Sequence, residues 1–160
     1  MKYAFPENLR TVLYPTEFRR QTVTETRRLS EIVLEHWPCV MGVVGESGPF
    51  KDMFVYQLGL RLTNRTGRYL FAPDDLGTFD PDLPTTGWYY LSGLGLLDPR
   101  WHQNVAVILQ RSLTGRSSVF LDMNTSDLEA AVGQQMATRI LPHFMMYSFQ
   151  FSQPKTIKKV

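Results

Sequence analysis

Residues 39–62 read CVMGVVGESGPFKDMFVYQLGLRL, and this stretch decides the fold class. Its first six residues, 39–44, form an uninterrupted apolar run typical of a strand buried on both faces of a parallel sheet. A loop with two glycines follows, and Pro49 suits the first turn of a helix. From Phe50 to Leu62 apolar residues recur at helical spacing. The stretch therefore predicts a strand, a tight loop and a helix.

Helical and extended patterns alternate on both sides of this stretch. Helices are expected at 16–36, 101–113 and 128–140, and strands at 69–72, 88–91, 119–123 and 144–151. Thr22 with Glu25 leaves a later start of the first helix open, and Ser126 with Glu129 predicts a capping box for the last one. The alternation predicts a single α/β domain over residues 1–160, with a mostly parallel sheet flanked by helices on both faces. Residues 1–15 and 153–160 are expected to be loose ends.

Composition places the chain among ordinary globular domains. With 160 residues, 43% of them hydrophobic, it can bury one core, and a net charge of +2 permits nucleic-acid binding without arguing for it. Cys39 is the single cysteine, lies in an apolar run and is expected to be a small buried hydrophobe. The N-terminal residues lack an apolar signal core, and no segment is long enough to cross a bilayer. We therefore expect a soluble cytoplasmic protein with no membrane partner.

The loop after residue 44 is the most suggestive motif. Gly45, Gly48 and Lys51 follow an apolar strand and open a helix, which is the placement of a phosphate-binding loop. Such loops cradle phosphates with backbone amides and the helix dipole, while the lysine reaches the outer phosphates. Asp122 ends another apolar strand, where a magnesium-binding aspartate would stand. These four residues are the candidate site for a nucleotide or another phosphate ligand.

Three departures from the motif argue against nucleotide chemistry. Phe50 stands where the glycine before the lysine belongs, Asp52 replaces the magnesium-binding hydroxyl residue, and Pro49 removes an amide donor. A carboxylate beside phosphates would also repel them. The alternative interpretation is an ordinary strand-to-helix turn.

No set of nucleophile, base and orienting group can be assembled from the sequence. The histidines, His36, His102 and His143, lie on three different predicted elements without the spacing of metal ligands. We expect no catalytic residues, no cofactor and no metal, and hence a protein that is not an enzyme.

Basic and aromatic residues supply the candidate partner surfaces. The pairs Arg19-Arg20 and Arg27-Arg28 lie largely off the apolar face of the first helix. They are either a solvated face or a surface for an acidic protein or nucleic acid. Parallel sheets bind ligands beyond the carboxyl ends of their strands, where we expect the loops 45–51, 73–87 and 123–127. We place Arg68 and Trp88 at this edge as interface residues, with a core position as the alternative for Trp88.

From residue 43 to 152 the order of elements resembles the SulA family of cell-division inhibitors. The similarity rests on the altered phosphate loop, on RYLFAP at 68–73, and on TGRSSVFL at 114–121 between a helix and a capped helix. The resemblance implies a RecA-like, P-loop-related three-layer sandwich without a working phosphate loop, acting in the SOS response by binding the tubulin-like division protein FtsZ. Of the family's interface, only Arg68 and, loosely, Trp88 carry over. The helix with the arginine pairs has no counterpart, and Asp122 and the two residues after it stand where the family has a tryptophan.

Three hypotheses follow from these patterns. The leading one is a non-enzymatic regulatory or binding protein that acts on a protein partner, which the resemblance makes FtsZ. The second is a degenerate P-loop protein that still binds a nucleotide or phosphate. The third is a nucleic-acid-associated accessory protein that uses the arginine pairs and the lysine-rich tail. Assembly into a homo-oligomer is open under each of them.

Overall fold

The sheet of this protein has five strands, all parallel, in the order β2-β3-β4-β1-β5. A computed structural model describes residues 13–62, 67–71, 87–92, 102–115 and 117–151. The strands are β1 (Val40–Val44), β2 (Gly67–Phe71), β3 (Trp88–Ser92), β4 (Ser118–Met123) and β5 (Phe144–Ser148). The helices are α2 (Thr16–Glu35), α3 (Pro49–Arg61), α4 (His102–Leu113), α5 (Leu128–Val132) and α6 (Gln134–Ile140), and a short 3-10 helix, η4 (Leu141–His143), follows α6.

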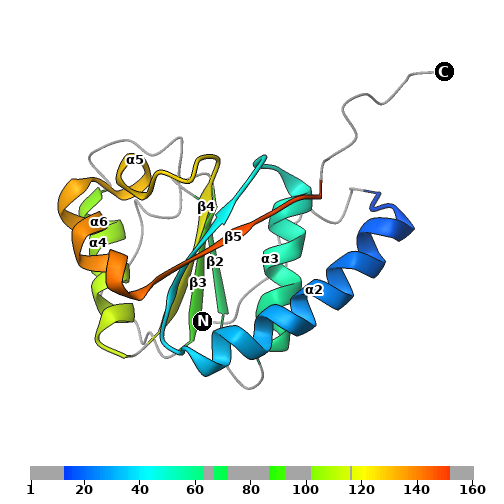
Figure 1. The fold of residues 1–160 in the computed structure, drawn as a ribbon, viewed down its shortest axis with the longest axis horizontal. Coiled ribbons are helices and arrows are strands. Elements are labelled where there is room, and N and C mark those ends of the chain that lie inside the picture. The colour runs from blue at the N-terminus through cyan, green and yellow to red at the C-terminus, as the bar shows by residue number, and fades with distance from the viewer. Residues whose placement is uncertain (1–12, 63–66, 72–86, 93–101, 116, 152–160) are drawn as a thin grey trace.

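Helices cover both faces of the sheet, so the prediction of a parallel α/β fold flanked by helices is confirmed. In Figure 1, α2 and α3 lie on one side of the sheet and α4, α5 and α6 on the other. The expected elements are present, and the first helix begins at Thr16 rather than near Thr22. The helix expected over 101–113 is α4, and residue 101 lies outside the described residues, as do both expected loose ends except for residues 13–15.

Alternation along the buried strands divides the core into two layers. On β3, Trp88 and Tyr90 belong to the cluster under α2 and α3, whereas Tyr89 and Leu91 belong to the cluster under α4 to α6. The side chains of a strand point alternately to opposite faces, so a strand that is apolar throughout feeds both layers. This explains why β4 is buried at every position. The result is a three-layer sandwich.

The C-terminal part of the chain departs from two predictions. One helix was expected over 128–140, but the chain forms two, because Gly133 has a φ of 86°, a conformation that glycine adopts without strain. The predicted capping box at Ser126 is also wrong. Asp127 is the N-cap of α5, and its carboxylate accepts from the backbone N–H groups of Glu129 and Ala130. The last strand ends at Ser148, three residues earlier than expected.

Candidate functional site: the Lys51 loop and the basic face of α2

The side chain of Lys51 is completely buried at the carboxyl ends of β1 and β4. Its ammonium donates to the carbonyl of Gly45 at 2.8 Å, to the carbonyl of Met123 at 2.9 Å and to Oδ1 of Asp122 at 2.9 Å. The exposed fractions of the two charged side chains are 0% and 2%. Because an ammonium has three hydrogens, these three bonds use its whole donor capacity. We call Gly45, Ser47, Lys51, Asp122 and Met123 the Lys51 site.

The backbone of the loop explains why glycine opens it. Gly45 has a φ of 150°, and a Cβ at this position would lie 2.7 Å from the carbonyl oxygen of Phe149. Its N–H bonds to the carbonyl of Met123 at 3.0 Å, which ties the end of β1 to the end of β4. The glycine therefore meets a steric demand of the fold. Pro49 begins α3 as predicted.

Two carboxylates accompany the single ammonium at this site. Ser47 donates its hydroxyl to Oδ1 of Asp122 at 3.0 Å. Asp52, in the first turn of α3, is 6% exposed and accepts from the hydroxyl of Tyr90 at 2.7 Å. Burial, with a contribution from the charge of Asp52, raises the pKa of nearby Tyr14 to about 12. Because Lys51 is already paired with Asp122, the buried carboxylate of Asp52 adds a negative charge at the start of α3, which is unfavourable for phosphate.

The structure brings Gly45, Lys51 and Asp122 together, as the phosphate-site hypothesis requires, with Gly48 as the N-cap of α3. It also shows what the lysine does in this arrangement. Lys51 joins the ends of two neighbouring strands and would have to break three bonds to reach a ligand. This geometry suits a structural role, in which Lys51 holds the ends of β1 and β4 together, better than a role in binding phosphate.

The four arginines of the predicted basic surface are all exposed on α2. Arg20 and Arg27 are seven residues apart and therefore lie on one stripe, away from the stripe that contains buried Leu29 and Val33. Arg28 pairs with Glu25 at 3.0 Å, and Arg20 approaches Glu17 at 4.0 Å. Arg19 and Arg27 form no ion pair within the described residues. Two of the four arginines are therefore without an ion pair in the described part of the chain, and all four are exposed.

A groove of about 410 Å³ runs between α2 and the end of β5, beside the basic surface. Its lining combines charged, polar and aromatic side chains: Arg20, Gln21, Thr24, Glu25, Tyr147, Gln150 and Phe151. Such a mixture suits a protein side chain better than a drug-like apolar ligand.

One polar network connects this groove to the arginine surface. The hydroxyl of Tyr147 donates to Glu25 at 3.0 Å, and Glu25 also accepts from Arg28. The hydrogen bond from Arg28 is the main reason that the pKa of Glu25 lies below its ordinary value. Burial, followed by the hydrogen bond to Glu25, raises the pKa of the Tyr147 hydroxyl. The network fixes the orientation of Arg28. No sequence pattern predicts this network, because Glu25 and Tyr147 are 122 residues apart and their contact has no local signal.

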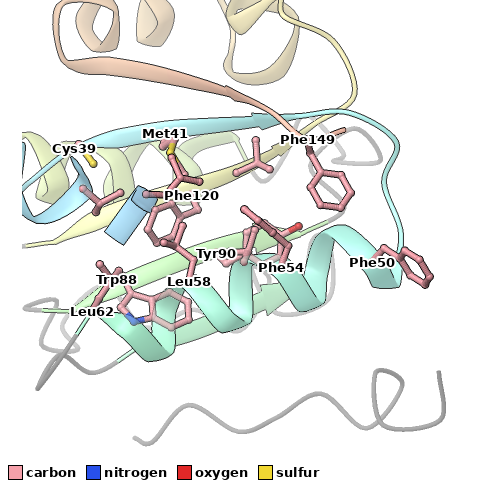
Figure 2. Packing of buried hydrophobic residues seen from close by; sticks show 14 of the residues in the cluster. Cys39, Met41, Phe50, Phe54, Leu58, Leu62, Trp88, Tyr90, Phe120 and Phe149 are labelled. Atoms are coloured by element: carbon pink, nitrogen blue, oxygen red, sulfur yellow. The ribbon is translucent and has the colours of Figure 1, made fainter. Parts of the chain in front are cut away.

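Two predicted interface residues do not lie where we expected them. Trp88 is 3% exposed and packs in the core, and Figure 2 shows its indole against α3 beside Leu58 and Leu62. The alternative core position is therefore the right one. Gly67 pairs with Trp88 and Arg68 with Tyr89, at the starts of β2 and β3. Arg68 and Trp88 thus lie near the amino ends of their strands, and the prediction of the carboxyl edge is wrong for both. The loop residues 73–86 lie outside the described part of the chain.

The chain matches no protein-family model and no curated protein sequence. Among the described residues, no helix is long and apolar enough to span a membrane. The same part of the chain contains no group of three or more histidine, cysteine or acidic residues placed to hold a metal ion.

Proposed function

We propose that this protein acts by binding a partner protein and that it catalyses no reaction. The observation that carries the proposal is the use of Lys51. The residue that would contact phosphates donates all three hydrogens to the protein itself, inside a buried ion pair with Asp122. A loop built this way supports the scaffold, and functional contacts are then left to exposed surfaces.

The basic face of α2 is the surface that best fits a partner. It presents Arg19, Arg20, Arg27 and Arg28 beside the mixed groove at Tyr147. An acidic protein surface complements such a face, and charge complementarity accelerates association. The resemblance to the SulA family makes FtsZ the first partner to test, and a regulatory role in cell division is the corresponding finer proposal.

The experiment measures GTP-dependent polymerisation of purified FtsZ by sedimentation, with increasing amounts of this protein. We expect less polymer with the parent protein and recovery with Arg20→Ala/Arg27→Ala. The double variant Arg111→Ala/Arg139→Ala removes the same charge from α4 and α6 and serves as the matched control. Unchanged polymerisation with the parent protein would overturn the assignment of FtsZ.

The same α2 variants test the charged surface against any partner. Binding through exposed arginines should weaken as salt rises, because such charges are screened over roughly 10 Å at 0.1 M salt. The variant with all four arginines replaced by alanine should lose binding and keep its melting transition. Binding that is insensitive to salt and to all four substitutions would exclude this surface. Binding to RNA or DNA instead of protein would support the nucleic-acid hypothesis.

A degenerate phosphate site is the second candidate, because the structure does gather Gly45, Lys51 and Asp122. A ligand that binds only the folded state stabilises it by about 2.7 kcal/mol at a hundred times its dissociation constant. Thermal unfolding with ATP, GTP or inorganic phosphate, with and without Mg²⁺, therefore separates the two functions. We expect no shift of the melting temperature.

A further inference from the structure

β5 forms one edge of the sheet, and its outer side is open among the described residues. It pairs with β1 alone, and the N–H of Phe149 bonds to the carbonyl of Val44. Because alternate residues of a strand direct their N–H and C=O groups to opposite sides, Tyr147 and Met145 face β1 as Phe149 does. Met146 and Ser148 therefore direct these groups outward, away from the sheet.

The side chains of this strand lack the usual protection of an edge. No charged residue and no proline occurs from Phe144 to Phe151. Met146 is 54% exposed, and Leu141, three residues before the strand, is 65% exposed. Natural proteins commonly shield an edge with lysine, proline or a bulge, because an open edge pairs with other strands. An open, uncharged and apolar edge of this kind can pair with a strand of another chain.

We propose that β5 pairs antiparallel with β5 of a second copy of this chain, across a two-fold axis at Met146. In this register the outward groups of Met146 bond to those of Met146 in the second copy. Phe144 then lies opposite Ser148 of the second copy, whose N–H meets the carbonyl of Phe144. The N–H of Phe144 takes no part, because it already bonds to the carbonyl of Leu141. The two sheets become one continuous sheet.

Charge favours a second copy as the occupant. A two-fold contact places each residue near its own copy, so a charged strand would oppose like charges. The neutral strand 144–148 avoids this repulsion entirely. The carboxylate of α2 that contacts this strand is already paired, since Glu25 accepts from Tyr147 and forms an ion pair with Arg28. The proposed pairing is made by backbone groups of β5 and by no arginine of α2, so the inference does not depend on the proposed function.

The test is the molar mass of the full chain in solution, measured by sedimentation equilibrium over a wide concentration range. We expect a dimer for the parent protein and a monomer for Met146→Lys, which places a charge opposite its own copy. Leu60→Lys is the matched control, because Leu60 is 58% exposed on α3 and lies outside the strand. This control should remain a dimer, and both variants should keep the far-ultraviolet circular dichroism spectrum of the parent.

A second variant tests the backbone pairing itself. Ser148→Pro removes an N–H that points outward and leaves the bond from Phe149 to Val44 in place. We expect a monomer with an intact far-ultraviolet circular dichroism spectrum. A parent protein that remains monomeric, or a dimer that survives both Met146→Lys and Ser148→Pro, would overturn the proposal. So would a dimer that only Leu60→Lys disrupts.

Discussion

At the scale of single residues, the main feature of this protein is a lysine that has a phosphate-loop position and a structural role. Burying an ammonium and a carboxylate removes both from water, and this cost is offset only when each group is well paired. Lys51 meets that condition with three acceptors, and Asp122 has both Lys51 and Ser47 as donors. Removing one partner would therefore leave a buried charge without compensation.

We predict that Lys51→Met lowers the free energy of unfolding by about 3–5 kcal/mol, the usual cost of breaking a buried pair from one side. Urea denaturation measures this change. Arg20→Met is the matched control, since Arg20 and Glu17 are 4.0 Å apart with side chains 72% and 71% exposed. Its cost should stay below about 1 kcal/mol. An equal loss of unfolding free energy in the two variants would show that Lys51 does not stabilise the fold through its buried contacts.

The contact between Gly59 and Trp88 gives a second prediction at this scale. A Cβ on Gly59 would collide with the six-membered ring of the Trp88 indole. Replacing a glycine by alanine inside a helix normally gains up to about 1 kcal/mol. Here we expect Gly59→Ala to destabilise the protein, because its neighbour is a bulky ring in a filled core. Thermal unfolding should show a partial recovery in Gly59→Ala/Trp88→Phe, and a stabilised Gly59→Ala protein would contradict the packing.

At the scale of elements, α2 has a buried apolar face and an exposed basic face. Phe18, Leu29 and Val33 face the core, while the arginines face outward. Glu25 connects the basic face to the sheet, because it accepts from Arg28 and from Tyr147 of β5. The ion pair between Arg28 and Glu25 is partly exposed, with side chains 55% and 30% accessible. It therefore contributes little to stability and mainly fixes the orientation of Arg28.

The lowered pKa of Glu25 predicts a pH effect with a defined sign. A carboxyl group whose pKa is lower in the folded state stabilises the fold above its unfolded pKa, and this contribution disappears as the pH falls through its folded pKa. Arg28→Ala should raise the pKa of Glu25 toward its ordinary value of 4.5, and Tyr147→Phe should raise it less. Nuclear magnetic resonance titration of the Glu25 carboxyl carbon measures both pKa changes.

Arg27→Ala is the control for this titration and should leave the pKa of Glu25 unchanged. An unchanged pKa of Glu25 in Arg28→Ala would refute the network.

At the scale of the whole molecule, the carboxyl ends of β1 and β4 meet beside the start of α3, as in proteins that bind phosphates. In this chain the place is occupied by the protein's own contacts, from Lys51 to two strands and from Tyr90 to Asp52. These internal bonds use the polar groups that a phosphate ligand would need at this end of the sheet.

We therefore predict no release of phosphate from ATP or GTP by the purified protein. Phe50 and Asp52 occupy the positions where turnover needs a glycine and a hydroxyl residue. A colorimetric phosphate assay with Mg²⁺ measures the rate. Phosphate release that disappears in Lys51→Ala, assayed at a temperature where this variant is folded, would contradict the prediction.

The sequence by itself determined the class and the order of the elements. The strand, loop and helix of residues 39–62, the apolar strand before Met123 and the helical stripe of α2 are local patterns, and local patterns report periodicity and turns. The exposure of the arginine pairs and the burial of Cys39 followed from the same reasoning.

Tertiary structure decided everything that depended on pairing distant segments. The sequence left two positions open for Trp88, the core or an exposed edge of the sheet. An apolar pattern predicts a strand, but it does not predict which face of the sheet a side chain lies on or how the strand pairs with its neighbours. The bonds from Lys51 to Asp122 and from Tyr147 to Glu25 join residues 71 and 122 positions apart, and no local signal precedes them. The role of Lys51 follows from where the fold places its acceptors. Because β1 pairs with β4, Gly45, Asp122 and Met123 lie close enough together to accept all three hydrogens of its ammonium.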